Sequence, residues 1–136
     1  MSASPRRARR ASIILAGCAA ALAGTASGES LLQFDLWMQR LDRGSQSVQR
    51  NLARGDARAA SVDARELLQL YQSMERFFAE RGQSDSAVTL SREGAELAGE
   101  VVRSIAVGDL SRASHQAIAI AQACRDCHEE YKPLDS

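Results

Sequence analysis

Apolar residues recur at steps of three and four along four consecutive stretches of this 136-residue chain. Such steps place about one side chain per turn on the same face of an α-helix. The positions are Leu31, Phe34, Met38, Leu41, Val48 and Leu52, with Ser45 in the one gap; Ala60, Ala64, Leu67, Tyr71, Met74 and Phe78; Val88, Ala95, Ala98, Val102 and Ile105; and Leu110, Ala113, Ala117, Ile120, Cys124, Cys127 and Tyr131. The pattern therefore predicts four amphipathic helices.

Glycine-containing turns separate the four stretches, at Gly55, Gly82 and Gly108. Glycine commonly ends a helix, and the Asp or Ser that follows each of these glycines can cap the next one. Short connections between helices of similar length make neighbours antiparallel. We therefore expect an all-α fold, an up-down-up-down four-helix bundle, in which the start of the first helix, the end of the second and the end of the fourth lie at the same pole.

The first 28 residues differ from the rest of the chain. They contain four arginines and no acidic residue in "MSASPRRARR", then an apolar run "ASIILAGCAAALAG" and the small residues "TASG". This order is typical of a secretory signal, and the apolar run is too short for a stable membrane-spanning helix. We expect residues 1–28 to be a signal peptide that directs export, and residues 29–136 to form the bundle domain.

Cys18 lies in "LAGC", which resembles the lipobox of bacterial lipoproteins. Two interpretations are open. Either the chain is cleaved before Cys18 and a lipid on this cysteine anchors the protein to a membrane, or cleavage follows Ala26 or Gly28 and Cys18 leaves with the signal peptide.

Charge excludes one class of function. Without its first 28 residues the chain has 13 basic and 17 acidic residues, a net charge of −4. Nucleic-acid binding proteins usually carry a basic stripe with interleaved aromatic residues, and only 4% of this chain is aromatic. We therefore do not expect a nucleic-acid partner.

The fourth stretch contains Cys124, Cys127 and His128 in "CRDCH", the C-x-x-C-H attachment motif of a c-type haem. Cysteines at i and i+3 share one face of a helix, so their two thiols can form thioethers with the two vinyl groups of one porphyrin. The adjacent imidazole can bind the iron as an axial ligand. We expect one covalent haem c, held by Cys124, Cys127 and His128.

Other chemistries suit this motif less well. Zinc requires four ligands, and the remaining candidates are Cys18 in the leader and His115, which lies nine residues before Cys124 and which we interpret as a surface histidine. A thioredoxin-like C-x-x-C opens a helix after a strand, whereas this motif closes a helix. A disulfide between Cys124 and Cys127 would close a loop that the helix already orders. A haem-free bundle acting as an interaction module is open only if both cysteines are unmodified.

The ending "CRDCHEEYK" resembles the C-x-x-C-H-x-x-Y-[RK] ending of class II c-type cytochromes, the cytochrome c′ family. The specific residues of the resemblance are Cys124, Cys127, His128, Tyr131 and Lys132, while the bundle architecture resembles the family over the whole mature chain. The resemblance implies a bacterial periplasmic protein with haem c near one pole, often a homodimer through its first two helices. This chain is shorter than typical members.

The group that faces the iron opposite His128 decides the function. Met38 belongs to the apolar face at the pole of the motif, and its thioether as sixth ligand would give His/Met iron, a higher potential and an electron carrier. Alternatively Met38 only packs, as in a typical cytochrome c′, and five-coordinate iron binds NO or CO. Met74 is the reserve ligand. In neither case does the sequence show a catalytic constellation, so we expect no enzyme.

Charged residues near this pole suggest two further contacts. Arg40 and Arg43 could pair with haem propionates, although exposed arginines usually face water. Asp126, Glu129 and Glu130 could orient a basic redox partner, or they form a solvated helix surface. The sequence does not identify the redox partner.

Overall fold

The structure, a computed structural model, describes residues 31–82 and 85–131. These residues form four helices and no strand: α1 (Leu31–Ala53), α2 (Ala57–Glu80), α3 (Asp85–Ala106) and α4 (Leu110–Glu130). The predicted all-α class and the number of helices are confirmed. The proposed signal peptide, including Cys18, and Lys132 lie outside the described residues.

Two of the turns have the same hydrogen-bonded structure. At the end of α1, the Asp56 amide donates to the Asn51 carbonyl at 2.9 Å and the Gly55 amide to the Leu52 carbonyl at 3.0 Å. The turn after α3 repeats this pattern around Gly108. This is the Schellman arrangement, which requires a left-handed residue, and Gly55 and Gly108 have φ of 72° and 79°. The predicted breaks are therefore where the chain reverses.

The residue after each of these glycines starts the next helix. Asp56 accepts a hydrogen bond from the Ala59 amide at 3.0 Å, and Asp109 accepts one from the Arg112 amide at 2.9 Å. Each carboxylate satisfies an amide that has no partner within its helix. Gly82, with φ of 60°, follows the end of α2 in the same way, as predicted.

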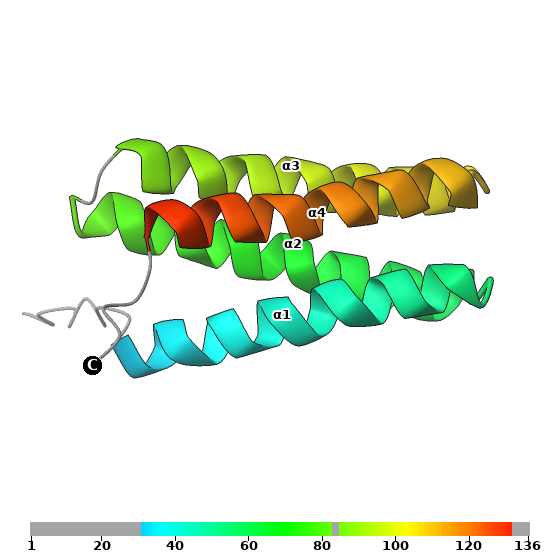
Figure 1. Cartoon of the computed structure of the whole chain (residues 1–136), viewed down its shortest axis with the longest axis horizontal. Helices are drawn as coiled ribbons and strands as arrows, with labels where there is room; N and C mark the ends of the chain where they lie inside the picture. Colours follow the sequence, from blue (N-terminus) through cyan, green and yellow to red (C-terminus); the bar gives the residue numbers. More distant parts are fainter. Residues whose placement is uncertain (1–30, 83–84, 132–136) are drawn as a thin grey trace, which may run out of the picture.

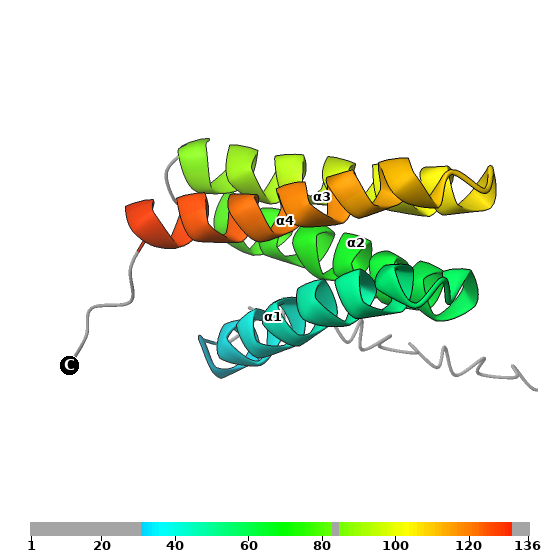
Figure 2. The same ribbon diagram turned by 45° about the vertical axis from the view of Figure 1, so that its right-hand side comes forward.

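Each helix packs against its neighbours in sequence, and α4 also packs against α1, which closes the bundle. Figure 1 shows the helices running alternately in opposite directions, with the end of α4, the start of α1 and the end of α2 at one pole. This predicted placement is confirmed. Figures 1 and 2 both show α1 diverging from α4 towards that pole, which we call the motif pole.

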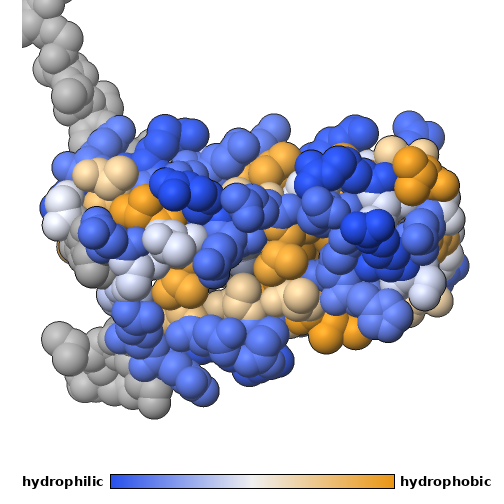
Figure 3. All heavy atoms as spheres, turned by 90° about the horizontal axis from the view of Figure 1, so that it is seen from above, coloured by the Kyte–Doolittle hydropathy of each residue, from blue (hydrophilic) through white to orange (hydrophobic). Residues whose placement is uncertain are grey.

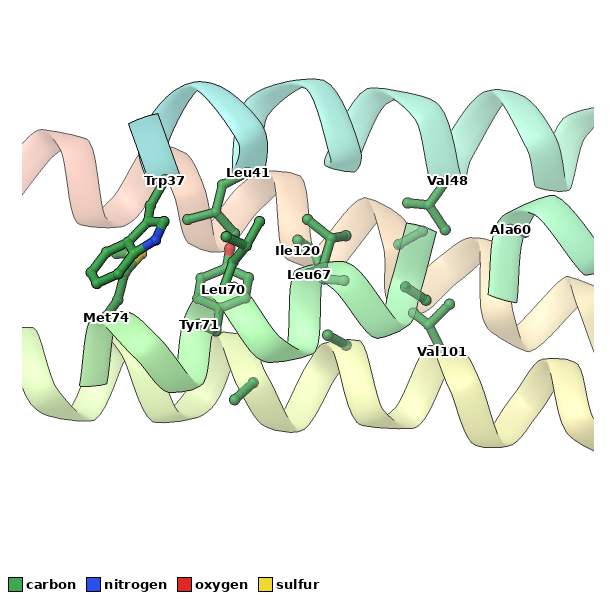
Figure 4. Close-up of a cluster of buried hydrophobic side chains, with 14 of the residues drawn as sticks. Trp37, Leu41, Val48, Ala60, Leu67, Leu70, Tyr71, Met74, Val101 and Ile120 are labelled. Atoms are coloured by element: carbon green, nitrogen blue, oxygen red, sulfur yellow. The ribbon is translucent and has the colours of Figure 1, made fainter. Parts of the chain in front are cut away.

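The interior is apolar along its whole length. Leu67, Val48, Val101 and Ile120 are fully buried, one from each helix. Figure 4 shows these four side chains pointing into the same interior. Burying side chains of this size contributes roughly 1.5–3 kcal/mol each. On the outside, Figure 3 shows polar side chains over most of one face, with apolar patches between them.

The predicted apolar faces are largely correct, and α2 follows its pattern throughout. Leu31 is an exception because it is 72% exposed at the first residue of α1. Trp37, Leu70 and Phe77 are buried although they lie outside the predicted faces. α2 packs against both α1 and α3, so its buried face is wider than one stripe.

Candidate cofactor site

The two cysteines of the motif lie in the last two turns of α4, on one side of the helix. Both are half-buried and neither forms a disulfide. The next residue, His128, is exposed. The α-helix continues through the motif to Glu130, and the amide of the next residue, the C-cap Tyr131, donates to the Cys127 carbonyl at 2.8 Å. The helix therefore presents both sulfurs and the imidazole from a regular backbone, as predicted.

Two cavities open beside these residues at the motif pole. The inner cavity has a volume of about 250 Å³ and is lined by residues of all four helices, including Cys124, Leu41 and Tyr71. The outer cavity has a volume of about 620 Å³ and reaches Phe34, Phe78 and Tyr131. Five residues line both, and they are Met38, Met74, Arg125, Cys127 and His128. The cavities are thus adjoining parts of one hollow, of the size that cofactor pockets have.

The two methionines singled out in the sequence both line this hollow. Met38 of α1 is half-buried, and Met74 of α2 is only 3% exposed. Figure 4 shows Met74 pointing from α2 into the interior. Both methionines therefore line the same hollow as His128.

Aromatic residues gather behind the outer cavity. Phe34 stacks on Phe77 with ring centroids 4.9 Å apart, and it meets Phe78 edge to face at 5.5 Å. Trp37, the only tryptophan of the chain, lies 5.9 Å from Phe77, also edge to face. All three phenylalanines and the tryptophan thus lie at the motif pole, where they provide a stiff apolar wall.

The Cys124 sulfur has a polar neighbour in the interior. The Tyr71 hydroxyl lies 3.2 Å from it, within hydrogen-bond distance. Burial raises the pKa of Tyr71 well above its usual value, and the nearby Cys124 raises it further. Burial also raises the pKa of Cys124, against the opposing effect of the Tyr71 hydrogen bond. The pKa of Cys127 is raised by burial and by Cys124. Both cysteines are therefore neutral thiols at neutral pH.

The two arginines considered in the sequence are both exposed and lie outside the lining of the cavities. Arg40 pairs with Glu66 of α2, with its Nη2 2.7 Å from Oε1, and lines neither cavity; nor does Arg43. The sequence analysis missed Arg125, which lies between the two cysteines and lines both cavities. Arg125 is exposed, and among the described residues that line the two cavities it is the only arginine or lysine.

The structure also shows where the three acidic residues near the motif lie. Glu129 lines the outer cavity, Glu130 accepts a hydrogen bond from Ser86, and Asp126 accepts one from Gln122 at 2.7 Å. All three are exposed. His115 is exposed as predicted, and its Nδ1 lies 2.9 Å from the carbonyl oxygen of Ser111, away from both cavities.

The geometry of the site can be compared with two alternative chemistries, a zinc site and a thioredoxin-like C-x-x-C. Within residues 31–82 and 85–131, no three His, Cys, Asp or Glu side chains are grouped so that they could hold a metal ion. A redox-active C-x-x-C requires a lowered thiol pKa, whereas burial raises it here. Neither a zinc site nor a thioredoxin-like site is therefore supported. In the same part of the chain, every helix is too short or too polar to cross a membrane.

Comparison with known proteins gives no relative: no protein family, no curated protein and no solved structure matches this chain.

Proposed function

We propose that this protein is an exported c-type cytochrome of the cytochrome c′ type, which carries one covalent haem c and transfers electrons. The observation that carries the proposal is the position of the C-x-x-C-H motif: Cys124, Cys127 and His128 all line the hollow, and Met38 and Met74 line it as well. The motif alone predicts attachment, and the hollow beside it gives the attached group a place in the bundle.

The residues around the hollow fit such a group. Its lining is mostly apolar, with Leu41 and Met74 in the interior and Phe34 and Phe78 near the opening, which suits the flat face of a porphyrin. The thiols of Cys124 and Cys127 would hold it, and His128 would bind its iron. When bound, the iron supplies reversible one-electron chemistry. The protein's contribution is to hold the group, limit its contact with water and set its axial ligands.

Electron transfer is the function that the methionines favour. A thioether opposite an imidazole stabilises reduced iron, which raises the potential, and it leaves no open position for another ligand. Met38 is our candidate because it lies on α1, across the hollow from α4, and its side chain is half-buried. Met74 lines the same space from α2 and is the reserve. The protein would then act as a carrier between other redox proteins, not as an enzyme.

The position of Leu41 supports a second function, the binding of a diatomic gas. This side chain lies one turn after Met38, is 4% exposed and lines the inner cavity. If Met38 and Met74 only pack, Leu41 would form an apolar wall over a free iron position, which would suit a diatomic gas such as NO or CO.

Export is part of the proposal. We interpret residues 1–28 as the signal peptide that takes the chain to the periplasm, either as a free protein or, if Cys18 is lipidated, on a membrane. Members of the cytochrome c′ family are often homodimers, and we propose a homodimer here only because of that resemblance.

The proposal is tested by expressing the full chain in a bacterial host that attaches haem to exported proteins. We expect a coloured periplasmic protein whose visible spectrum changes reversibly with one electron in a potentiometric titration. The Cys124→Ala/Cys127→Ala chain is the control and should be exported without colour. A colourless wild-type protein from the same host would overturn the proposal.

A further inference from the structure

Tyr71 connects the middle of the bundle to the motif. Its side chain is 5% exposed, its hydroxyl lies 3.2 Å from the Cys124 sulfur, and both residues line the inner cavity. Figure 4 shows the ring on α2 pointing into the core, with its oxygen towards Leu41. The hydroxyl is thus a buried polar group at the first of the two attachment sulfurs.

The ring is held in place by α3. A Cβ atom built on Gly94 would lie 2.3 Å from Tyr71 Cε1, 2.5 Å from Cδ1 and 2.6 Å from Cζ. No real Cβ contact is that short, so the ring occupies space that exists only because residue 94 is glycine. The ring edge therefore rests directly against the α3 backbone, and the position of the hydroxyl is set by packing.

The hydrogen bond has a defined direction once a thioether forms. A thiol and a phenol can each donate to the other, but a thioether sulfur has no proton, so the tyrosine must then be the donor. A buried hydroxyl without a partner is unfavourable, which favours the sulfur orientation that receives this hydrogen bond. The described residues offer no comparable hydrogen bond to Cys127. Within this part of the chain, the Cys124 sulfur is therefore held by a hydrogen bond, and the Cys127 sulfur is not.

We propose that Tyr71 is a positioning residue for the bound haem: in the folded protein it donates a hydrogen bond to the Cys124 sulfur and so fixes the orientation of the porphyrin edge that this sulfur holds. The thioether itself forms when the S–H bond adds across the vinyl C=C bond, so that sulfur bonds one carbon and the proton goes to the other. No oxidant or reductant is consumed. The inference rests on the proposed function, because it requires covalent haem.

The hydrogen bond should also influence the bound group. Donation to the thioether sulfur withdraws electron density from it and, through its bond to the porphyrin, from the ring around the iron, which favours the reduced state. Removing the donor should therefore shift the midpoint potential to more negative values. This readout is independent of how efficiently the haem is attached.

The test compares wild type with Tyr71→Phe, which keeps the ring and removes only the hydroxyl. We expect Tyr71→Phe to keep both thioethers, as checked by peptide mass spectrometry, and to have a more negative midpoint potential. Ser104→Ala is the matched control. It deletes another buried hydroxyl, which donates to Gln116 at 2.8 Å and lines neither cavity. This variant should resemble wild type in both measurements.

The outcomes separate the two proposals. Wild type without covalent haem would overturn the proposed function. Wild type with two thioethers, together with an identical Tyr71→Phe variant, would overturn only the role of Tyr71. If Tyr71→Phe does not fold, as judged by its helical circular dichroism, the test moves to haem-free wild type. There, NMR should show a slowly exchanging Tyr71 hydroxyl proton close to the Cys124 β-protons, and its absence would contradict the inference.

Discussion

The hydroxyl groups of Ser86 and Tyr131 are hydrogen-bonded to each other, which joins the first turn of α3 to the residue that ends α4. Ser86 also donates to Glu130. The turn of α4 that follows the C-x-x-C-H motif is therefore attached to a second helix, and the two cysteines lie on a segment that is fixed at its end.

Ser86→Ala should weaken the attachment of the last turn of α4 to α3. Losing a hydrogen bond of this kind costs about 1 kcal/mol, so we expect a lower free energy of unfolding by about that amount in urea titrations of the haem-free protein. Ser114→Ala is the control, because its hydroxyl donates within its own helix to the Leu110 carbonyl. It should change the stability by less than about 0.5 kcal/mol. Equal effects of the two substitutions would contradict the role of Ser86.

Two glycines of α3 should respond oppositely to alanine. Gly94→Ala places a methyl group 2.3 Å from the buried Tyr71 ring, so we expect a destabilisation of about 1–3 kcal/mol. In Gly99→Ala the nearest atom is Arg103 Nη1 at 3.3 Å, the end of a flexible exposed side chain. The helix then gains about 0.5–1 kcal/mol from the better helix former. Thermal unfolding followed by circular dichroism measures both, and a stable Gly94→Ala protein would contradict the close contact.

The buried thiols make the haem-free protein sensitive to alkaline pH. Burial raises the pKa of Cys124, so the folded protein keeps this proton to a higher pH than the unfolded chain does. The unfolded state therefore releases protons first as pH rises, and the free energy of unfolding should fall between about pH 8 and about pH 10. Urea titrations across that range measure the slope. The Cys124→Ala/Cys127→Ala variant should have a smaller slope, and an unchanged one would show that the thiols are not responsible.

The sixth ligand is tested by replacing each methionine with leucine, which removes the sulfur and nearly conserves the volume. If Met38 binds the iron, wild type is low-spin, and Met38→Leu becomes high-spin, binds CO and has a lower potential. Met74→Leu serves as the matched control and should keep the wild-type spectrum. A wild type that is already high-spin and binds CO directly would contradict Met38 ligation and favour the gas-binding function.

Much of the fold could be predicted because local signals determine it. Gly55 and Gly108 adopt the left-handed conformation that ends a helix, and the aspartate after each is the cap of the next helix. These signals depend on a few neighbouring residues. Antiparallel packing then follows from the short turns, and it brings the start of α1 and the end of α4 to the same pole.

The site was predicted less completely, because its details depend on contacts between helices. The spacing of Cys124, Cys127 and His128 indicates attachment chemistry, but no local pattern reveals that the Tyr71 hydroxyl reaches a sulfur 53 residues away. The sequence also did not reveal that Arg40 pairs with Glu66, since the choice of ion-pair partner depends on how α1 rotates against α2.

The central claim is that Cys124 and Cys127 bind one haem covalently. The most direct measurement is the intact mass of the exported wild-type protein after denaturation and extraction with acidified organic solvent. Thioether bonds survive this treatment, so the predicted result is the mass of the mature chain plus one haem. The mass of the bare chain, with or without haem in the solvent, would contradict the account.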